Sequence, residues 1–296
     1  MQVYLVPAVD GVGYGLLLFC AAAGLSLAFG VADVLNLAHG TLYAAGAYTA
    51  AALAGATVGG LVTAVAVAAA IGAVGGAALA TATAPLAGRG HLPQVMLTLG
   101  AGYVGVDVLT TVFGADELPT APPAVLDRSI SLVGHAYPAY RLVFIGIGAA
   151  LAVGLQVVVY HSRAGAVVRA CVDDRQMLAC LGYHPFAVST AVLAAAGGLA
   201  AGGGALGAPI IGAAPSTATT IMLLSLVVVV LGGPGDIRGA LVASLAVGQV
   251  QTLGYAAAPT LAPFLLFAPM AAVLAWRARP AGHRRDLRTV LLGRPS

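Results

Sequence analysis

The stretch VGYGLLLFCAAAGLSLAFGV, residues 12–31, decides the fold. It runs for 20 residues without a charge, and about 20 apolar residues are what a helix needs to cross the hydrocarbon core of a membrane. The rest of the chain has the same character. Of its 296 residues, 60% are hydrophobic and 8% are charged, whereas roughly a quarter of an ordinary soluble domain is charged. The composition therefore predicts an all-α protein, a polytopic bundle of transmembrane helices.

Further apolar runs follow the first along the whole chain. They lie at about Leu42–Ala56, Val58–Ala84, Val95–Phe113, Leu142–Tyr160, Phe186–Leu206, Thr219–Leu231, Ala240–Leu253 and Leu261–Trp276. Two stretches look interrupted, Asp33–Gly40 by polar residues and Gly207–Ser216 by two prolines. Broken or re-entrant helices in a bundle line a pathway more often than they face lipid. We expect eight or nine spans, in a single transmembrane domain over residues 1–296.

The basic residues predict the orientation. All 13 are Arg, three of them in the loop His161–Pro185 and six in the tail after Trp276. Arg-rich loops stay in the cytoplasm, so we expect a cytoplasmic loop at about 161–185 and a basic cytoplasmic tail at about 277–296. The stretch Ala115–Tyr140 then lies outside, and nine spans place the N-terminus outside as well. Because the chain has no Lys, it carries neither a P-loop nor a Schiff-base lysine.

Four Gly-xxx-Gly pairs favour close helix packing, because small residues let membrane helices approach each other. They are Gly11/Gly15, Gly55/Gly59, Gly72/Gly76 and Gly198/Gly202.

The polar patch before Gly40 is the first candidate site. Asp33, Asn36 and His39 recur every three residues, so in a helix they fall roughly on one side. Such a stripe at a membrane edge either lines a substrate path or belongs to a simple interfacial turn. Asn36 is also a potential N-cap for the next helix, and Gly40 permits a tight bend.

The loop Ser162–Pro185 predicts one short amphipathic helix. Ser162 is a typical N-cap, and Gly182 with Pro185 is a typical stop. Arg169 and Asp173 are spaced to pair across one helical turn. This helix either lies on the lipid surface or docks into a partner protein.

Asp107 is the one acid well inside an apolar run. Burying it costs about 2.5–3.5 kcal/mol on insertion scales, and such residues are functional candidates. The turn Leu231–Ala240 holds Asp236 and Arg238, which are placed to pair across it. The sequence has no zinc-protease, serine-hydrolase or metal-ligand motif, so we expect no enzyme and no metal site. Its basic residues are scattered and its aromatic residues are few, at 6%, so we expect no nucleic-acid partner.

Several of these stretches together resemble the permease family of ATP-binding-cassette (ABC) importers for branched-chain amino acids, specifically the H-type (LivH-type) subunit. The matching stretches run in order along the chain: Gly24–Gly40 with Gly46–Tyr48, Gln94–Gly100, His161–Gly165 with Arg169, Asp174 and Leu181–Gly182, and Leu231–Gly235 with Gly239–Ala240. Thr41 departs from the family, which often has an acidic residue at that position.

The resemblance implies a division of labour among subunits. Two separate ABC ATPases bind the ATP, so this chain needs no cofactor of its own. A second, M-type (LivM-type) permease shares the pathway, an extracytoplasmic solute-binding protein delivers the solute, and lipid surrounds the chain in the bacterial plasma membrane. Alternatives are a permease for urea or short amides, or a stand-alone channel or secondary transporter.

The resemblance and the residues singled out above give two candidate groups. Candidate pathway residues are Asp33, Asn36, His39, Gly40, Thr98 and Asp107. Candidate ATPase-coupling residues are Arg163, Gly165, Arg169, Asp173, Asp174, Leu181 and Gly182.

Overall fold

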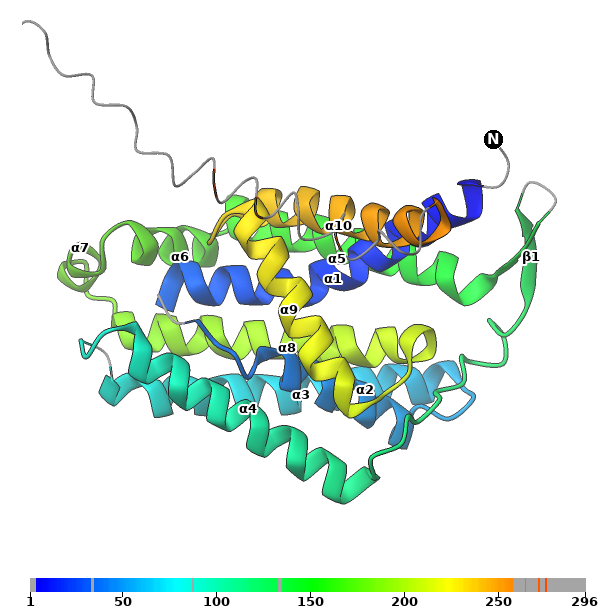
Figure 1. Ribbon diagram of the computed structural model, residues 1–296. Coiled ribbons are helices and arrows are strands. Elements are labelled where there is room, and N and C mark those ends of the chain that lie inside the picture. Colours follow the sequence, from blue (N-terminus) through cyan, green and yellow to red (C-terminus); the bar gives the residue numbers. More distant parts are fainter. Residues whose placement is uncertain are drawn as a thin grey trace, which may run out of the picture.

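A computed structural model describes residues 4–32, 35–86, 88–132 and 135–257, together with Phe264, Ala271 and Ala275. Its long helices are α1 (Leu5–Ala32), α2 (His39–Leu53), α3 (Val58–Thr83), α4 (His91–Phe113), α5 (Ala139–His161), α8 (Pro185–Ile211), α9 (Pro215–Gly232) and α10 (Ile237–Ala257). The shorter elements are the 3₁₀ turn η2 (Ala84–Leu86), the strands β1 (Ser129–Leu132) and β2 (His135–Pro138), and the helices α6 (Arg163–Asp173) and α7 (Arg175–Cys180). The predicted helical bundle is confirmed (Figure 1).

Seven of the described helices are long and apolar enough to cross a membrane, all of the long ones except α2. Each of the first eight predicted runs corresponds to one helix. The 15 residues of α2 extend only about 22 Å at 1.5 Å per residue, less than the roughly 30 Å hydrocarbon core. Helix α2 is therefore too short to cross the membrane by itself. The ninth predicted run and the basic tail lie outside the described residues.

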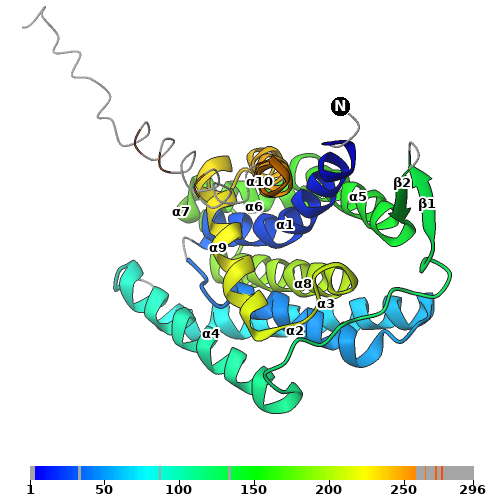
Figure 2. The ribbon, with the colours of Figure 1, turned by 45° about the vertical axis from the view of Figure 1, so that its right-hand side comes forward.

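Helix α8 lies at the centre of the bundle, with α1 on one side and α2 and α3 on the other (Figure 2). Glycines bring these helices into backbone contact. An ideal methyl group on Gly46 of α2 would overlap the carbonyl oxygen of Ala201, and one on Gly72 of α3 would overlap that of Gly197. On α1, a methyl group at Gly24 would lie 2.7 Å from the carbonyl oxygen of Ala196.

The Gly-xxx-Gly pairs divide into two kinds. Gly72 and Gly76 press α3 onto α8, and Gly11 and Gly15 press α1 onto α10. Gly55 and Gly59 have open space around them, because Gly55 lies in the α2–α3 turn and Gly59 in the exposed first turn of α3. Gly198 and Gly202 contact α3 more loosely than Gly197 does.

The first predicted interruption is a real break inside the bundle. Helix α1 runs antiparallel to α8, since Gly24 faces Ala196 while Cys20 faces Gly203. After residue 32 the chain turns back, and His39 at the start of α2 is level with Ala21, in the middle of α1. The second predicted interruption is wrong as a break within a span. Helix α8 continues through Pro209 to Ile211, because a proline in the last turn removes only one hydrogen bond, and Pro215 begins α9.

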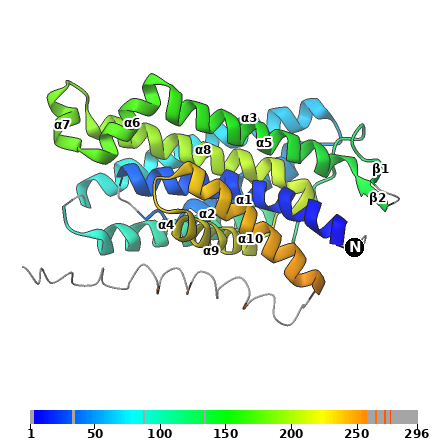
Figure 3. The same cartoon turned by 90° about the horizontal axis from the view of Figure 1, so that it is seen from above.

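The two ends of the bundle differ (Figure 3). One end, which we call the hairpin end, carries the start of α1 and the antiparallel hairpin β1–β2, which pairs Ser129 with Pro138. The sequence did not predict this hairpin. The other end, which we call the α6–α7 end, carries α6 and α7 as a projection. The predicted single helix there is wrong: it breaks at Asp174, whose backbone is extended between α6 and α7.

Replacing Gly46 with Ala tests the packing around α8. The added methyl group meets backbone on the opposite helix, which cannot rotate away, so we expect a loss of about 2–3 kcal/mol of stability. Thermal unfolding of the purified protein in detergent measures it. Gly154→Ala in α5 is the matched control, because its surroundings are open. Equal melting temperatures for the two variants would contradict this packing.

Candidate functional site

The break before α2 is held by Thr98 of α4. The Thr98 hydroxyl donates to the carbonyl oxygen of Leu35 at 3.1 Å and accepts from the N–H of Leu37 at 3.2 Å. The Oδ1 atom of Asn36 accepts from the N–H of Ala38 at 3.1 Å. Both polar side chains are buried: Thr98 is fully enclosed and Asn36 is 2% exposed. They supply the hydrogen bonds that a non-helical backbone needs at membrane depth.

Helix α2 is anchored at its first residues. The Nε2 atom of His39 lies 2.8 Å from the carbonyl oxygen of Ala21, so this nitrogen carries the hydrogen and donates. Gly40 contacts α9 so closely that a methyl group there would overlap the carbonyl oxygen of Ala218. Thr41 donates to the carbonyl oxygen of Gly102 at 3.1 Å. The polar patch thus holds a bent chain among three helices.

A groove lies beside this break, between α4 and α9. Its cavity is about 260 Å³ and is mostly apolar. It is lined by Leu37, Thr41, Leu99, Gly102, Tyr103, Val106, Ala218, Thr219, Met222 and Leu223. In Figure 1, α4 lies at the edge of the bundle and α9 crosses its front face.

Asp107 lies on the exposed side of α4, away from the break. Its neighbours on that side, Tyr103, Val104 and Val108, are also more than half exposed. Asp107 is therefore separate from the buried Asn36–His39–Thr98 group.

The α6–α7 projection is capped at both of its helix starts. The Ser162 hydroxyl accepts from the N–H of Gly165 at 3.0 Å, as predicted. The Asp174 carboxylate accepts from the N–H groups of Gln176 and Met177, at 2.8 and 2.9 Å. Gly182 ends the unit with a φ of 85°, a left-handed conformation that favours glycine.

Arginines tie the projection to the ends of the membrane helices. Arg169 donates to the carbonyl oxygen of Val159 at the end of α5, and Arg175 donates to that of Val31 at the end of α1. The predicted Arg169–Asp173 pair does not form, because Arg169 turns toward α5 instead.

The outer side of the projection is partly apolar and exposed, with Val172, Met177, Leu181 and Tyr183. Arg163 and Asp173 are exposed on the same unit, whereas Gly165 is buried against the end of α5.

The predicted Asp236–Arg238 ion pair does not form among the described residues: the backbone N–H of Arg238 donates to Asp236 Oδ1, and the guanidinium turns to Tyr160. The Tyr160 hydroxyl donates to Asp236 Oδ1 at 3.0 Å, and the Arg238 guanidinium lies 4.5 Å from the centre of the Tyr160 ring. The α9–α10 turn is thereby joined to the end of α5, next to the projection.

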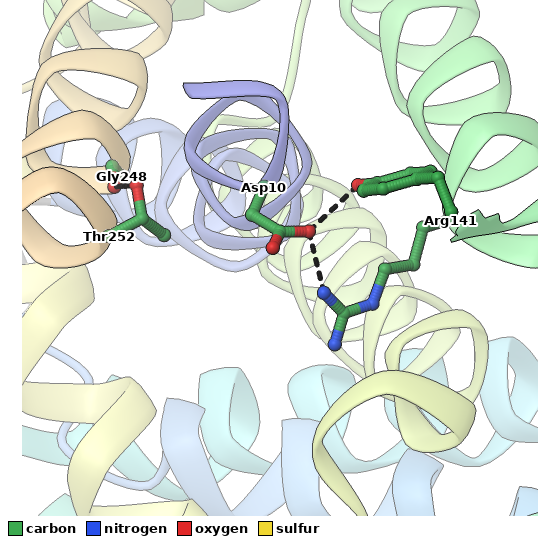
Figure 4. A network of polar contacts seen from close by, with 5 residues as sticks. Asp10, Arg141, Gly248 and Thr252 are labelled. Carbon is green, nitrogen blue, oxygen red and sulfur yellow. Dashed lines mark hydrogen bonds and ion pairs between the residues drawn. The ribbon is translucent and has the colours of Figure 1, made fainter. Parts of the chain in front are cut away.

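The sequence analysis missed a charged network at the hairpin end. Asp10 Oδ1 accepts from Arg141 at 2.6 Å and from the Tyr137 hydroxyl at 2.7 Å (Figure 4). Burial and the Asp10 carboxylate raise the pKa of the Tyr137 phenol, so it remains a donor. In the sequence, Asp10 and Arg141 are lone opposite charges near the ends of two predicted spans. The sequence alone does not show that α1 and α5 are neighbours, so it does not pair them.

The predicted site residues thus fall into three places. Asn36, His39, Gly40 and Thr98 meet at the break, Asp107 faces outward, and the predicted coupling residues all belong to the projection. Asp33 lies outside the described residues. No cluster of potential metal ligands occurs in the described part of the chain.

This arrangement defines a class: a multi-pass helical membrane protein with a broken helix beside a groove and a projection at one end. Comparison of the sequence with known protein families identifies the family. The model for the permease component of branched-chain amino acid transport systems matches residues 8–274, and the chain belongs to that family. It is a transport component and not an enzyme, as predicted.

One curated relative matches along most of the chain. The sequence is 26% identical over 270 residues to the high-affinity branched-chain amino acid transport system permease protein BraD of Pseudomonas aeruginosa, covering 85% of this chain and 86% of the relative. No solved structure gave a significant match.

Substituting Thr98 with Val tests whether this hydroxyl holds the break. Valine keeps the shape but leaves buried backbone groups without partners, which costs about 1–3 kcal/mol. We expect a lower melting temperature in detergent. Thr98→Ser keeps the hydroxyl and should remain close to the original protein; if both variants melt alike, the hydrogen bonds do not stabilise the break.

Proposed function

We propose that this chain is the H-type permease subunit of an ABC importer for branched-chain amino acids. It works with a second permease, two ATPases and an extracytoplasmic solute-binding protein in a bacterial plasma membrane. The observation that carries the proposal is the capped α6–α7 projection, tied by arginines to the ends of α1 and α5, in a chain of this transport family. A rigid projection with exposed apolar side chains suits docking into a partner.

The distribution of charge supports an orientation. Five arginines gather at the α6–α7 end: Arg89, Arg163, Arg169, Arg175 and Arg238. The hairpin end carries the acids Asp116, Glu117 and Asp127, along with Arg128 and Arg141. Since Arg-rich loops remain in the cytoplasm, the α6–α7 end faces the ATPases and the hairpin end faces the binding protein.

The groove between α4 and α9 supports a pathway shared with the second permease. An ionisable side chain inside a span faces protein or water rather than lipid. The exposed face of α4 with Asp107 is therefore the face that the second permease covers. The buried residues Asn36, His39, Gly40 and Thr98 shape the pathway indirectly, by fixing the bend beside the groove.

The projection offers a mechanical link from ATPase to pathway. Arg175 of α7 holds the carbonyl of Val31, which immediately precedes the broken segment. A displacement of the projection by the ATPases moves the end of α1 and, through it, the chain that turns back toward Asn36. No bond is made or broken on this subunit; the free energy comes from ATP on the partners.

Uptake by the reconstituted complex tests this function. We expect proteoliposomes to accumulate radiolabelled leucine only with ATP, both ATPases and the binding protein present. Uptake by this chain alone, without ATP, would instead identify a stand-alone channel or secondary transporter.

The docking surface is tested by Leu181→Asp. Leu181 is 63% exposed, so the change leaves the fold intact, but a carboxylate in an apolar interface weakens binding. We expect ATPase binding to fall by about tenfold or more, measured by co-purification and ATPase stimulation. Val125→Asp is the control, because Val125 is 65% exposed at the hairpin end. Unchanged co-purification of the Leu181 variant would refute the docking assignment.

The cap of α7 gives a matched pair of variants. Asp174→Ala removes the acceptor for two N–H groups and costs about 1 kcal/mol locally, so α7 frays and ATPase stimulation falls. Asp174→Asn keeps an N-cap acceptor and should preserve most stimulation. If the two variants couple equally, the shape of α7 is irrelevant to coupling.

A further inference from the structure

Two adjoining cavities lie at the hairpin end. The first, about 190 Å³, is lined by Asp10, Gly13, Tyr14, Tyr137, Arg141, Phe144, Ile210, Ile211 and Thr252. The second, about 160 Å³, is lined by Tyr14, Ile211, Ser216, Thr217, Thr220 and Ile221. They share Tyr14 and Ile211. For scale, an engineered apolar cavity of about 150 Å³ accommodates benzene, so the first cavity has room for a small solute.

The charged pair in the first cavity is only partly satisfied by protein. Both protein hydrogen bonds to Asp10 go to Oδ1, and Arg141 donates to Asp10 through one nitrogen. Within the described ranges, Asp10 Oδ2, the remaining guanidinium N–H groups of Arg141 and the Tyr14 hydroxyl have no protein partner. Asp10 is 25% exposed and Arg141 is 37% exposed by side chain. In Figure 4 the Asp10 carboxylate lies between α10 and the Arg141 guanidinium.

The remaining walls are mainly apolar. Phe144 comes from α5, and Ile210 and Ile211 come from the end of α8. Gly13 contributes no side chain, which leaves space next to Asp10. The cavity thus combines a free carboxylate oxygen and free guanidinium donors with an apolar pocket.

This combination matches one class of solute. An apolar α-amino acid carries an ammonium, a carboxylate and a hydrocarbon side chain. Its ammonium complements Asp10 Oδ2, its carboxylate complements the free Arg141 donors, and its side chain complements Phe144 and the two isoleucines. A neutral urea or amide makes neither ion pair. We propose that this cavity is a binding site for the zwitterionic head group of an apolar α-amino acid, held between Asp10 and Arg141.

The inference deepens the proposed function and rests on it. It places an entry site within this subunit, at the end that faces the binding protein. The second cavity continues from Tyr14 toward the start of α9, the helix that also borders the α4–α9 groove. Solute released by the binding protein therefore meets a charge-complementary site before it reaches the groove.

The test measures leucine uptake by the full reconstituted complex. We expect Asp10→Asn and Arg141→Gln each to raise the KM for transport about tenfold or more, since each removes a charge-assisted contact. Asp127→Asn and Arg128→Gln are matched controls, exposed at the same end, and should leave KM unchanged. Ile211→Trp enlarges a side chain that lines both cavities, removes neither charge and should raise KM as well. Valinamide and isovalerate, which each lack one charge, should not compete with leucine.

A charge-swapped variant separates substrate binding from a purely structural ion pair. Asp10→Arg combined with Arg141→Asp restores an ion pair but reverses its direction relative to the apolar walls. We expect the melting temperature to recover while KM stays high. Recovery of KM in the swap overturns the site, as does an unchanged KM in the Ile211→Trp variant.

If the swap does not fold, the single charge variants and the Ile211→Trp variant still decide the outcome. Failure of the site and failure of the proposed function remain distinct. If the site is wrong, ATP-dependent leucine uptake remains intact and its KM is insensitive to these residues. If the proposed function is wrong, the original complex shows no such uptake.

Discussion

Backbone contact between helices is the constraint on which this structure depends. Lipid is as apolar as leucine, so helices in a membrane gain little from hiding hydrophobic side chains and depend on close packing instead. Glycines on α1, α2 and α3 meet the backbone of α8 directly. Three helices are thereby fixed around one central helix. The break and the groove lie beside this packed frame, because Gly46 holds α2 against Ala201 of α8.

The sequence predicted the elements better than their partners. Apolar runs and Arg-rich loops located eight helices and the projection, since membrane thickness sets helix length and each signal is local. The hairpin β1–β2 was missed because its eight residues follow a proline-rich stretch with no strong alternation. The second helix of the projection was missed because Asp174 caps α7, a role that the sequence spacing of Arg169 and Asp173 obscured.

In the candidate site, too, the residues were easier to predict than their contacts. Asn36, His39 and Thr98 were singled out as polar residues in an apolar chain, and the structure brings them together. Periodicity suggested a stripe facing a path, whereas Asn36 and Thr98 serve the backbone of a bent segment. Thr98 is remote in sequence from that segment, and only the approach of α4 pairs them. Asp10 and Arg141 were missed for the same reason, since neither is informative until α1 and α5 are neighbours.

Helix α4 differs from the rest of the bundle in how little of it is enclosed. Only 11% of its most apolar stretch is buried. The Thr98 hydroxyl joins it to the broken segment, and the Thr41 hydroxyl of α2 joins it to that helix. These three neutral hydrogen bonds contribute about 3 kcal/mol together. Helix α4 is therefore the helix most easily displaced from the bundle. The subunit behaves as a stiff frame with one compliant wall, and that wall borders the groove.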